Sequence, residues 1–162
     1  VGGVRLNIAD AEELRAAARE MRVSVGRAAP QARLEGFQVQ EVIRGLAEIL
    51  VGFSRDASVG PIVSVGLGGV LAELYQDVSV RPAPVSASEA RCMINEVRAL
   101  APLAGYRNLP RGDLDALAQA IAQVSSLACT GDVRVAEAEI NPLAVLPDGR
   151  GVCALDGLVV LQ

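Results

Sequence analysis

Apolar residues in the first part of the chain recur at helical spacing. Residues 3–9 are predicted to form a short strand, after which Asp10 begins a helix, because an aspartate can accept hydrogen bonds from the free amides of a first helical turn. Glu13 completes a pattern like a capping box. The buried stripe of this helix is predicted to be Leu14, Ala17, Ala18 and Met21. Residues 23–35 contain glycine and proline and are predicted to be a loop.

The pattern then changes from helical spacing to short apolar or alternating runs. The first of these alternates from Phe37 to Ile43, which is typical of a half-buried strand. The predicted strands in this part of the chain are residues 37–43, 46–53, 61–67, 70–75 and 78–83. Glycine and aspartate separate most of them, and such short connections favour antiparallel pairing.

Two helices follow the strands. Ser86 and Glu89 form a capping box before the first helix, and Asp113 begins the second. Residues 101–112 are predicted to be the loop between them. The inward positions are Ala90, Met93, Ile94, Val97 and Leu100 in the first helix and Leu114, Leu117, Ile121, Val124 and Leu127 in the second.

A terminal hairpin completes the predicted order. Its strands are residues 133–146 and 151–161, joined by a turn at Asp148-Gly149, which is a favoured two-residue hairpin sequence. We therefore expect an α+β fold in which helices pack on a mostly antiparallel sheet.

The composition excludes several classes of protein and site. The chain has 162 residues, 51% of them apolar and 21% charged, which is incompatible with a disordered chain. No apolar run is long enough to cross a membrane. The net charge of −4 and the 2% of aromatic residues argue against nucleic-acid binding. Without histidine there is no Ser-His-Asp or Cys-His catalytic unit, and three cysteines cannot complete a four-cysteine zinc site.

The three cysteines and the first residues indicate the context of the chain. Cys92, Cys129 and Cys153 are widely spaced and odd in number, so we expect reduced, buried thiols in a cytoplasmic protein. The chain begins Val1-Gly2-Gly3 without methionine or a targeting segment, and we expect it to be a fragment of a longer protein.

The terminal hairpin predicts a cluster of oxygen ligands. Glu137, Glu139 and Asn141 share one strand face by alternation. If Asp148-Gly149 is the turn, Asn141 lies directly opposite Asp156, with Cβ atoms about 4.5–5.5 Å apart. Amide and carboxylate oxygens of this kind suit Mg²⁺. The alternative is a solvated hairpin face with no ligand.

Two further segments carry candidate chemistry. Glu41 and Glu48 are carboxylates on apolar faces, which is costly unless they are paired or face a cleft, and they could accept from an adenine amine or ribose hydroxyls. The alternative is a pair of solvated carboxylates. Residues 66–69 are glycine-rich and could approach a phosphate, although a tight turn is the simpler interpretation. Arg55-Asp56 and Arg81 are surface charges that could contact a phosphate.

Several motifs together resemble one known family. In order, they are Gly2-Gly3-Val4, Val39-Gln40-Glu41, Glu48-Ile49-Leu50-Val51-Gly52, Gly60-Pro61-Ile62-Val63, Val65-Gly66-Leu67-Gly68-Gly69-Val70, Asp77–Pro84, Glu139-Ile140-Asn141-Pro142-Leu143 and Ala154-Leu155-Asp156-Gly157. They resemble the C-terminal part of the ATP-grasp domain of the NDP-forming (ADP-forming) acyl-CoA synthetases, or acetate–CoA ligases, which are relatives of the β subunit of succinyl-CoA synthetase. The resemblance covers essentially the whole chain, so residues 1–162 are expected to form a single, partial ATP-grasp domain.

The resemblance implies a function and roles for matching residues. The family joins a carboxylic acid to coenzyme A at the expense of ATP through acyl-phosphate and phosphohistidine intermediates. By this match, Asn141 and Asp156 bind Mg²⁺ and Glu48 contacts the ribose of ATP. Glu41 and the following backbone of Val42 and Ile43 match the adenine-binding segment. Glu139 matches a catalytic glutamate near the phosphohistidine loop.

The departures from the family pattern are as informative as the matches. The chain has neither the phosphate-binding lysine of the family nor its phosphohistidine. We expect both in other parts of the protein, the histidine on a CoA-binding domain or subunit that acts as the partner. The fragment alone is expected to be inactive as a ligase, and exposed apolar surface would favour self-association into a homo-oligomer.

Two other functions stay open from the sequence. One is a nucleotide-sensing or degenerate ATP-grasp module attached to another catalytic domain, such as an acetyltransferase. The other is an interaction module that holds a CoA-binding partner through its sheet and binds no nucleotide.

Overall fold

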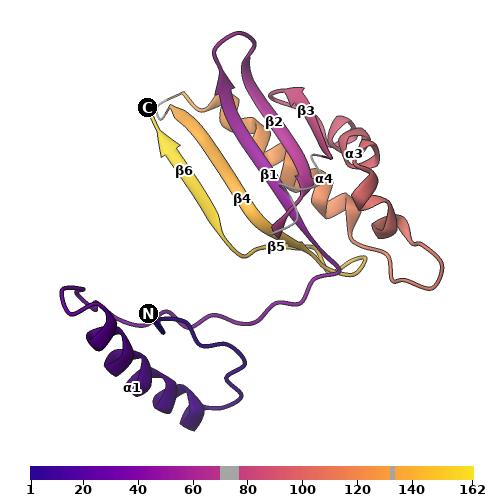
Figure 1. Cartoon of the computed structure of the whole chain (residues 1–162). Helices are drawn as coiled ribbons and strands as arrows, with labels where there is room; N and C mark the ends of the chain where they lie inside the picture. The colour runs from indigo at the N-terminus through magenta and orange to yellow at the C-terminus, as the bar shows by residue number, and fades with distance from the viewer. Residues whose placement is uncertain (70–76, 132–133) are drawn as a thin grey trace. The chain divides into compact units, whose positions relative to one another are not determined.

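The computed structural model describes residues 1–69, 77–131 and 134–162. Its central element is an antiparallel sheet formed within residues 43–162, in which the strand order is β3-β2-β1-β4-β5 and β6 also pairs with β4 (Figure 1). The strands are β1 (Ala47–Asp56), β2 (Gly60–Leu67), β3 (Val78–Pro82), β4 (Val135–Val145), β5 (Val152–Ala154) and β6 (Gly157–Leu161). The predicted strand at residues 70–75, and Val133 at the start of the predicted hairpin, lie outside the described residues.

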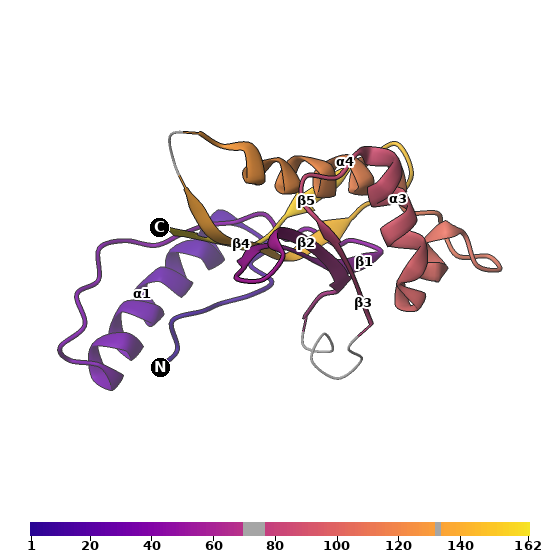
Figure 2. The same cartoon turned by 90° about the horizontal axis from the view of Figure 1, so that it is seen from above.

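The helices of this part of the chain lie on one face of the sheet (Figure 2). They are α3 (Ala87–Glu96), η2 (Arg98–Ala104), α4 (Leu114–Ser125) and η3 (Ser126–Cys129). The predicted capping box at Ser86 and Glu89 is present, and Asp113 caps α4. The loop predicted at residues 101–112 instead begins with the last residues of η2. The predicted α+β class is therefore confirmed.

One hydrophobic core joins the helices to the sheet. It contains Ile49 and Val51 of β1, Val63 and Val65 of β2, and Leu143 and Val145 of β4, packed with Met93, Ile94, Leu117 and Ile121 of the helices. Along β1 the buried residues Ile49, Val51 and Phe53 alternate with more exposed ones. The alternate side chains therefore face away from α3 and α4, and we call this side of the sheet the far face.

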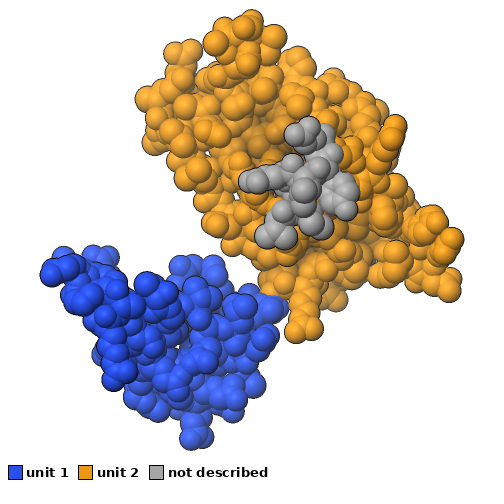
Figure 3. Space-filling view, viewed as in Figure 1, with its two compact units in different colours: residues 1–42 blue, residues 43–162 orange. Residues whose placement is uncertain are grey.

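Residues 1–42 form a separate compact unit (Figure 3). Its helix α1 (Ala11–Ala28) begins as predicted, because the Asp10 carboxylate accepts hydrogen bonds from the Glu12 and Glu13 amides at 2.8 and 2.9 Å. Of the predicted stripe, Ala17 is buried and Leu14, Ala18 and Met21 are half-buried, while Val25, which the prediction did not include, is also buried. The helix also continues through Gly26 to Ala28, so the prediction of a loop from residue 23 was wrong.

Two predicted strands are absent from the described structure. Residues 3–9 and 37–43 lie outside any helix or strand, although both have the alternating pattern of a strand. A strand is stable only when its backbone groups pair with a neighbour. Both sides of β1 are occupied by β2 and β4, and no strand of the described residues pairs with either segment.

The cysteines differ in part from the prediction. All three are free thiols, as expected, but Cys92 and Cys129 are exposed and Cys153 is half-buried, so the expectation of buried cysteines was wrong. Cys92 is on α3 beside the buried Met93, on the side of the helix that faces solvent. Among the described helices, none combines the length and the hydropathy that a membrane span requires.

Candidate functional site

The C-terminal hairpin has the register that its turn predicts. Leu143 of β4 pairs with Ala154 of β5, and β6 continues the same register further along β4. Between the two ladders the backbone amide of Asn141 donates to the backbone carbonyl of Asp156 at 3.2 Å. Asn141 and Asp156 therefore lie opposite each other, as the sequence predicts.

A β-bulge lies at the same position of β4. Ile49 of β1 pairs with Leu143, but Val51 pairs with Ile140, so β4 has one residue more than β1 over this stretch. The two residues that oppose Leu50 are Asn141 and Pro142. Proline has no N–H to donate to the ladder, and bulges of this kind change the direction of a side chain. The bulge therefore determines the direction in which the Asn141 side chain leaves β4.

Both hydrogen-bonding ends of the Asn141 carboxamide have partners. Its Oδ1 accepts from the Gly69 amide at 3.2 Å, and its Nδ2 donates to Glu139 Oε1 at 3.1 Å. Because an ionised carboxylate only accepts hydrogen bonds and an amide N–H only donates, the two partners define which end of the carboxamide is oxygen. One lone pair of Oδ1 remains for a further ligand.

Glu48 lies beside the same glycine turn. The Glu48 carbonyl accepts from the Gly68 amide at 2.8 Å, and a Cβ on Gly69 would lie 2.9 Å from Glu48 Oε2. The Glu48 carboxylate is therefore in close contact with the backbone of the turn whose next amide holds Asn141.

The strand register puts Glu48 and Glu139 on the far face of the sheet. Ile49 and Val51 are buried in the core, so their neighbours Glu48 and Gly52 face the opposite side of β1. Gly52 pairs directly with Glu139, and paired residues share a face. We call Glu48, Gly69, Glu139 and Asn141 the carboxylate–glycine cluster.

The donor set at the hairpin fits a magnesium ion. Asn141 Oδ1 and the carboxylates of Glu139 and Asp156 are hard oxygen donors, and the Asp156 side chain also accepts from the Gly157 amide at 2.8 Å. Over the described ranges, no three His, Cys, Asp or Glu side chains form a group that could hold a metal. Mg²⁺ needs no such group, since it usually takes one or two carboxylates together with waters and substrate phosphates.

Three of the predicted nucleotide-binding residues lie at the boundary of the two units. Glu41 and Val42 are the last residues of the first unit, and Ile43 is the first of the second. Glu41 and Val42 are exposed and Ile43 is half-buried. Their assignment to adenine binding stays a prediction.

The charged residues suggested as phosphate contacts have partners within the fold. Arg55 Nε donates to the Val135 carbonyl at 2.8 Å, and Arg81 forms an ion pair with Glu96. Asp56 accepts from two backbone amides in the turn between β1 and β2, and these hydrogen bonds lower its pKa. These contacts agree with the interpretation of all three residues as ordinary surface charges.

Gly69 belongs to the glycine-rich segment 66–69 for which the sequence suggests approach to a phosphate, but its hydrogen bond to Asn141 was not predicted. The sequence contains a signal for Gly69, because Gly68-Gly69 follows β2 directly and paired glycines allow a close backbone approach. What the sequence does not contain is the partner of the Gly69 amide, which lies on a strand far along the chain.

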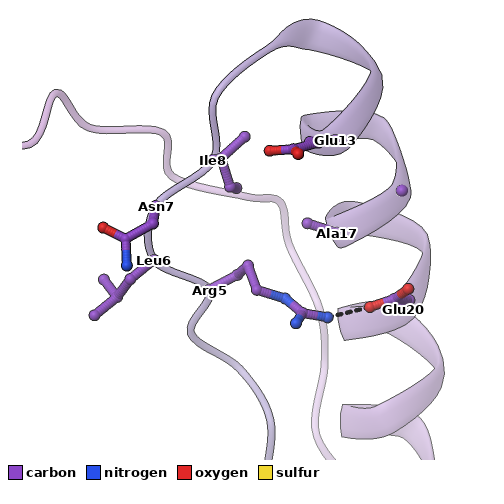
Figure 4. Close-up of a pocket in the computed structure, with 8 residues that line it drawn as sticks. Arg5, Leu6, Asn7, Ile8, Glu13, Ala17 and Glu20 are labelled. Carbon is purple, nitrogen blue, oxygen red and sulfur yellow. Dashed lines mark hydrogen bonds and ion pairs between the residues drawn. The ribbon is translucent and has the colours of Figure 1, made fainter.

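A hollow of about 300 Å³ lies in the first unit, between residues 5–8 and α1 (Figure 4). Arg5 and Glu20 form an ion pair across it. Its lining consists of Arg5, Leu6, Asn7, Ile8, Glu13, Ala16, Ala17 and Glu20. None of the predicted site residues belongs to this lining.

The sequence matches the family pattern of the ATP-grasp domain over residues 1–161. The chain is 39% identical over 152 residues to an ADP-forming acetate–CoA ligase I of Archaeoglobus fulgidus, covering 94% of this chain and 22% of the ligase. It is 36% identical to the β subunit of ADP-forming acetate–CoA ligase I of Pyrococcus furiosus, covering 99% of this chain and 68% of that subunit. The chain thus spans about a fifth of the first relative and about two-thirds of the second.

A solved structure has the same fold. It is a dinucleotide-forming acetyl-coenzyme A synthetase of Candidatus Korarchaeum cryptofilum, in complex with coenzyme A and Mg-AMPPCP, with its phosphohistidine segment pointing towards the nucleotide-binding site. The TM-score is 0.84 at 34% identity, and the match covers 99% of this chain and 68% of that one. Fold, sequence pattern and relatives agree, and the chain belongs to the ATP-grasp family, in the group of the ADP-forming acyl-CoA synthetases.

Proposed function

We propose that these residues form the Mg²⁺–ATP-binding part of an ADP-forming acyl-CoA synthetase. The observation that carries the proposal is the carboxylate–glycine cluster, in which β1, the turn after β2 and the bulge of β4 bring Glu48, Gly69, Glu139 and Asn141 to one face. The cluster gathers carboxylate oxygens, an amide oxygen and glycine backbone on one face, which are the groups that Mg²⁺ and phosphate ligands use.

The hairpin end of this face would hold the metal. Asn141 through Oδ1 and Asp156 through its carboxylate are the proposed Mg²⁺ ligands. Bound there, Mg²⁺ would neutralise charge on the phosphates of ATP. Glu139 is the proposed catalytic residue, and it also orients the Asn141 carboxamide by accepting its Nδ2 hydrogen.

The other end would bind the nucleoside. Glu48 can accept hydrogen bonds from ribose hydroxyls, and its contact with the Gly68-Gly69 backbone limits where its carboxylate can lie. Glu41, with the backbone of Val42 and Ile43, is the proposed adenine-binding segment. The similarity to a structure that holds Mg-AMPPCP supports nucleotide binding by this fold.

The complete reaction needs groups that this chain does not have. A carboxylic acid, ATP and coenzyme A would give acyl-CoA, ADP and phosphate, with the phosphoryl group passing through acyl phosphate and a histidine. The chain contains no histidine, so a CoA-binding domain or subunit would supply it. Such a partner is consistent with the relative that is a β subunit and with the phosphohistidine segment of the similar structure. We place the enzyme in the cytoplasm.

The test is calorimetric titration of the full-length gene product with ATP, with and without Mg²⁺. We expect Asn141→Ala and Asp156→Ala each to weaken Mg²⁺-dependent binding about tenfold or more, because a hydrogen bond or ligand to a charged group contributes about 1.5–3 kcal/mol. Binding measured without Mg²⁺ should change little.

A matched control is available on the same strand. Glu137 shares the face of Glu139 but lies further from the bulge and is exposed. Glu137→Gln should leave Mg²⁺–ATP binding unchanged, whereas Glu139→Gln should impair phosphoryl transfer. If the wild-type protein binds no ATP, the proposal is wrong and an interaction module is favoured. Binding without any acyl-CoA formation would favour a nucleotide sensor.

A further inference from the structure

Gly69 lies beside two residues that the proposed function assigns to opposite ends of the nucleotide. Its amide donates to Asn141 Oδ1 at 3.2 Å, and a Cβ added to the same residue would lie 2.9 Å from Glu48 Oε2. Asn141 comes from the β4 bulge and Glu48 from the beginning of β1. Gly69 therefore lies next to both Asn141 and Glu48.

The glycine turn is fixed in place by its own contacts. The Gly68 amide donates to the Glu48 carbonyl at 2.8 Å. A Cβ on Gly68 would lie 2.8 Å from the carbonyl carbon of Ile49 and 3.0 Å from the amide nitrogen of Leu50, which are backbone atoms of a paired strand and cannot move aside. Only glycine fits at position 68, and the turn is therefore seated on β1.

At Gly69 the restriction is of another kind. Its φ is +71°, a conformation that side chains rarely adopt, and among the described residues the only atom within 4 Å of an added Cβ is Glu48 Oε2. A substitution here would push the Glu48 carboxylate and strain the peptide that carries the N–H toward Asn141. It would leave the packing of the described core unchanged, because no atom of the described core residues lies within 4 Å of the added Cβ.

We propose that Gly69 is a positioning residue for the metal site: its amide holds Asn141 Oδ1 in the orientation that Mg²⁺ binding requires. Glu139 holds the opposite end of the same carboxamide, so Gly69 and Glu139 together prevent it from rotating. This inference rests on the proposed function. Groups that orient a metal ligand typically change metal affinity by about 10–100-fold when they are lost.

The experiment compares Gly69→Ala with Gly60→Ala in the full-length gene product. Gly60 is a matched control, because its φ is +84° and an added Cβ would meet nothing within 4 Å, at the β1–β2 turn. Both variants have the strain of a positive φ, but only the first disturbs the cluster. We expect Gly69→Ala to raise the Mg²⁺ concentration for half-maximal ATP binding roughly tenfold, and Gly60→Ala to leave it unchanged.

A second measurement needs no ligand. In a ¹⁵N-labelled sample, the side-chain amide resonances of Asn141 are assigned by their loss in Asn141→Asp. They should shift or broaden in Gly69→Ala and stay unchanged in Gly60→Ala. If Gly69→Ala fails to fold, Gly69→Asn replaces it, because asparagine tolerates this backbone conformation better.

The possible outcomes separate this inference from the proposed function. If Gly69→Ala and Gly60→Ala behave alike in both measurements, while Asn141→Ala loses Mg²⁺-dependent binding, the role of Gly69 is wrong and the proposed function stands. If wild-type protein binds no ATP but its Asn141 resonances respond to Gly69→Ala, the proposed function and its metal site are wrong. Only the structural contact would then remain.

Discussion

Asp113 is a single residue that connects α4 to the hairpin of the candidate site. It is 8% exposed, and its carboxylate accepts from the Ala116 amide at 3.0 Å and from the Gly151 amide at 2.8 Å. The first bond caps α4, and the second holds the chain just after the Asp148-Gly149 turn. These backbone hydrogen bonds lower the pKa of Asp113 below the ordinary value of 3.8, and the bond from Ala116 has the largest effect.

The direction of this pKa shift predicts a pH dependence of stability. A carboxyl group with a lowered pKa in the folded state stabilises the fold above its unfolded pKa, and this contribution is lost as the pH falls through the folded value. We expect Asp113→Ala to lower the urea midpoint at pH 7, and the difference from wild type to shrink steadily below pH 3.8. Denaturation curves at several pH values measure it.

The control for this prediction is Asp148→Asn, which removes an exposed carboxylate from the same hairpin. It should change the urea midpoint little at neutral pH. A difference between Asp113→Ala and wild type that stays constant down to the acid limit would contradict the assignment.

At the residue scale, the sequence predicts local interactions well and distant ones poorly. Asp10, Ser86 and Asp113 cap helices as predicted, because a cap depends only on the next three residues. The opposition of Asn141 and Asp156 follows from one short turn. The bond from Gly69 to Asn141 joins the turn after β2 to β4, which is distant in the chain, and no local pattern encodes it.

At the scale of the elements, α4 contributes several buried residues to the hydrophobic core. Leu117 is fully buried between the helices and the sheet. We expect Leu117→Ala to reduce the free energy of unfolding by about 2–5 kcal/mol, through lost burial and the cavity it leaves. Chemical denaturation followed by circular dichroism provides the measurement.

Leu109 provides the comparison for Leu117. It is 55% exposed in the segment before α4, so Leu109→Ala should change the free energy of unfolding by about 0.5 kcal/mol or less. Equal losses in the two variants would mean that the helix does not pack on the sheet as described.

Strand prediction succeeded where a partner strand exists. The patterns at 46–53, 61–67 and 78–83 correspond to β1, β2 and β3, each of which pairs with a neighbour. Residues 37–43 have an equally regular alternation but no pairing partner in the described structure. Alternation describes the side chains of a strand, whereas its stability also requires a neighbouring backbone, which the sequence of one segment does not encode.

For the whole molecule, the division into two units predicts where a protease acts first. Arg33 and Arg44 are exposed and lie outside helix and strand, between α1 and β1. Trypsin requires an accessible, extended segment after arginine or lysine, and the arginines within α3 and the sheet do not offer one. We expect early cleavage of the 162-residue chain to give a resistant product that begins at Gly45, identified by mass spectrometry.

Arg44→Gln serves as the control for this cleavage. It should move the new N-terminus of the product to Leu34, the residue after Arg33. First cleavage after Arg55 or Arg91, which lie in β1 and α3, would contradict the division into units.

The pairing of β1 with β4 has a consequence for how the protein reaches its native state. The β1–β2 and β4–β5 hairpins connect residues that are close in the chain, but Glu48 pairs with Ala144 across all the intervening helices. Joining such distant segments carries a large entropic cost and is slow relative to hairpin closure. A chain with both hairpins formed would still lack the complete far face of the sheet, so we expect the ability to bind nucleotide to arise in the last step of folding.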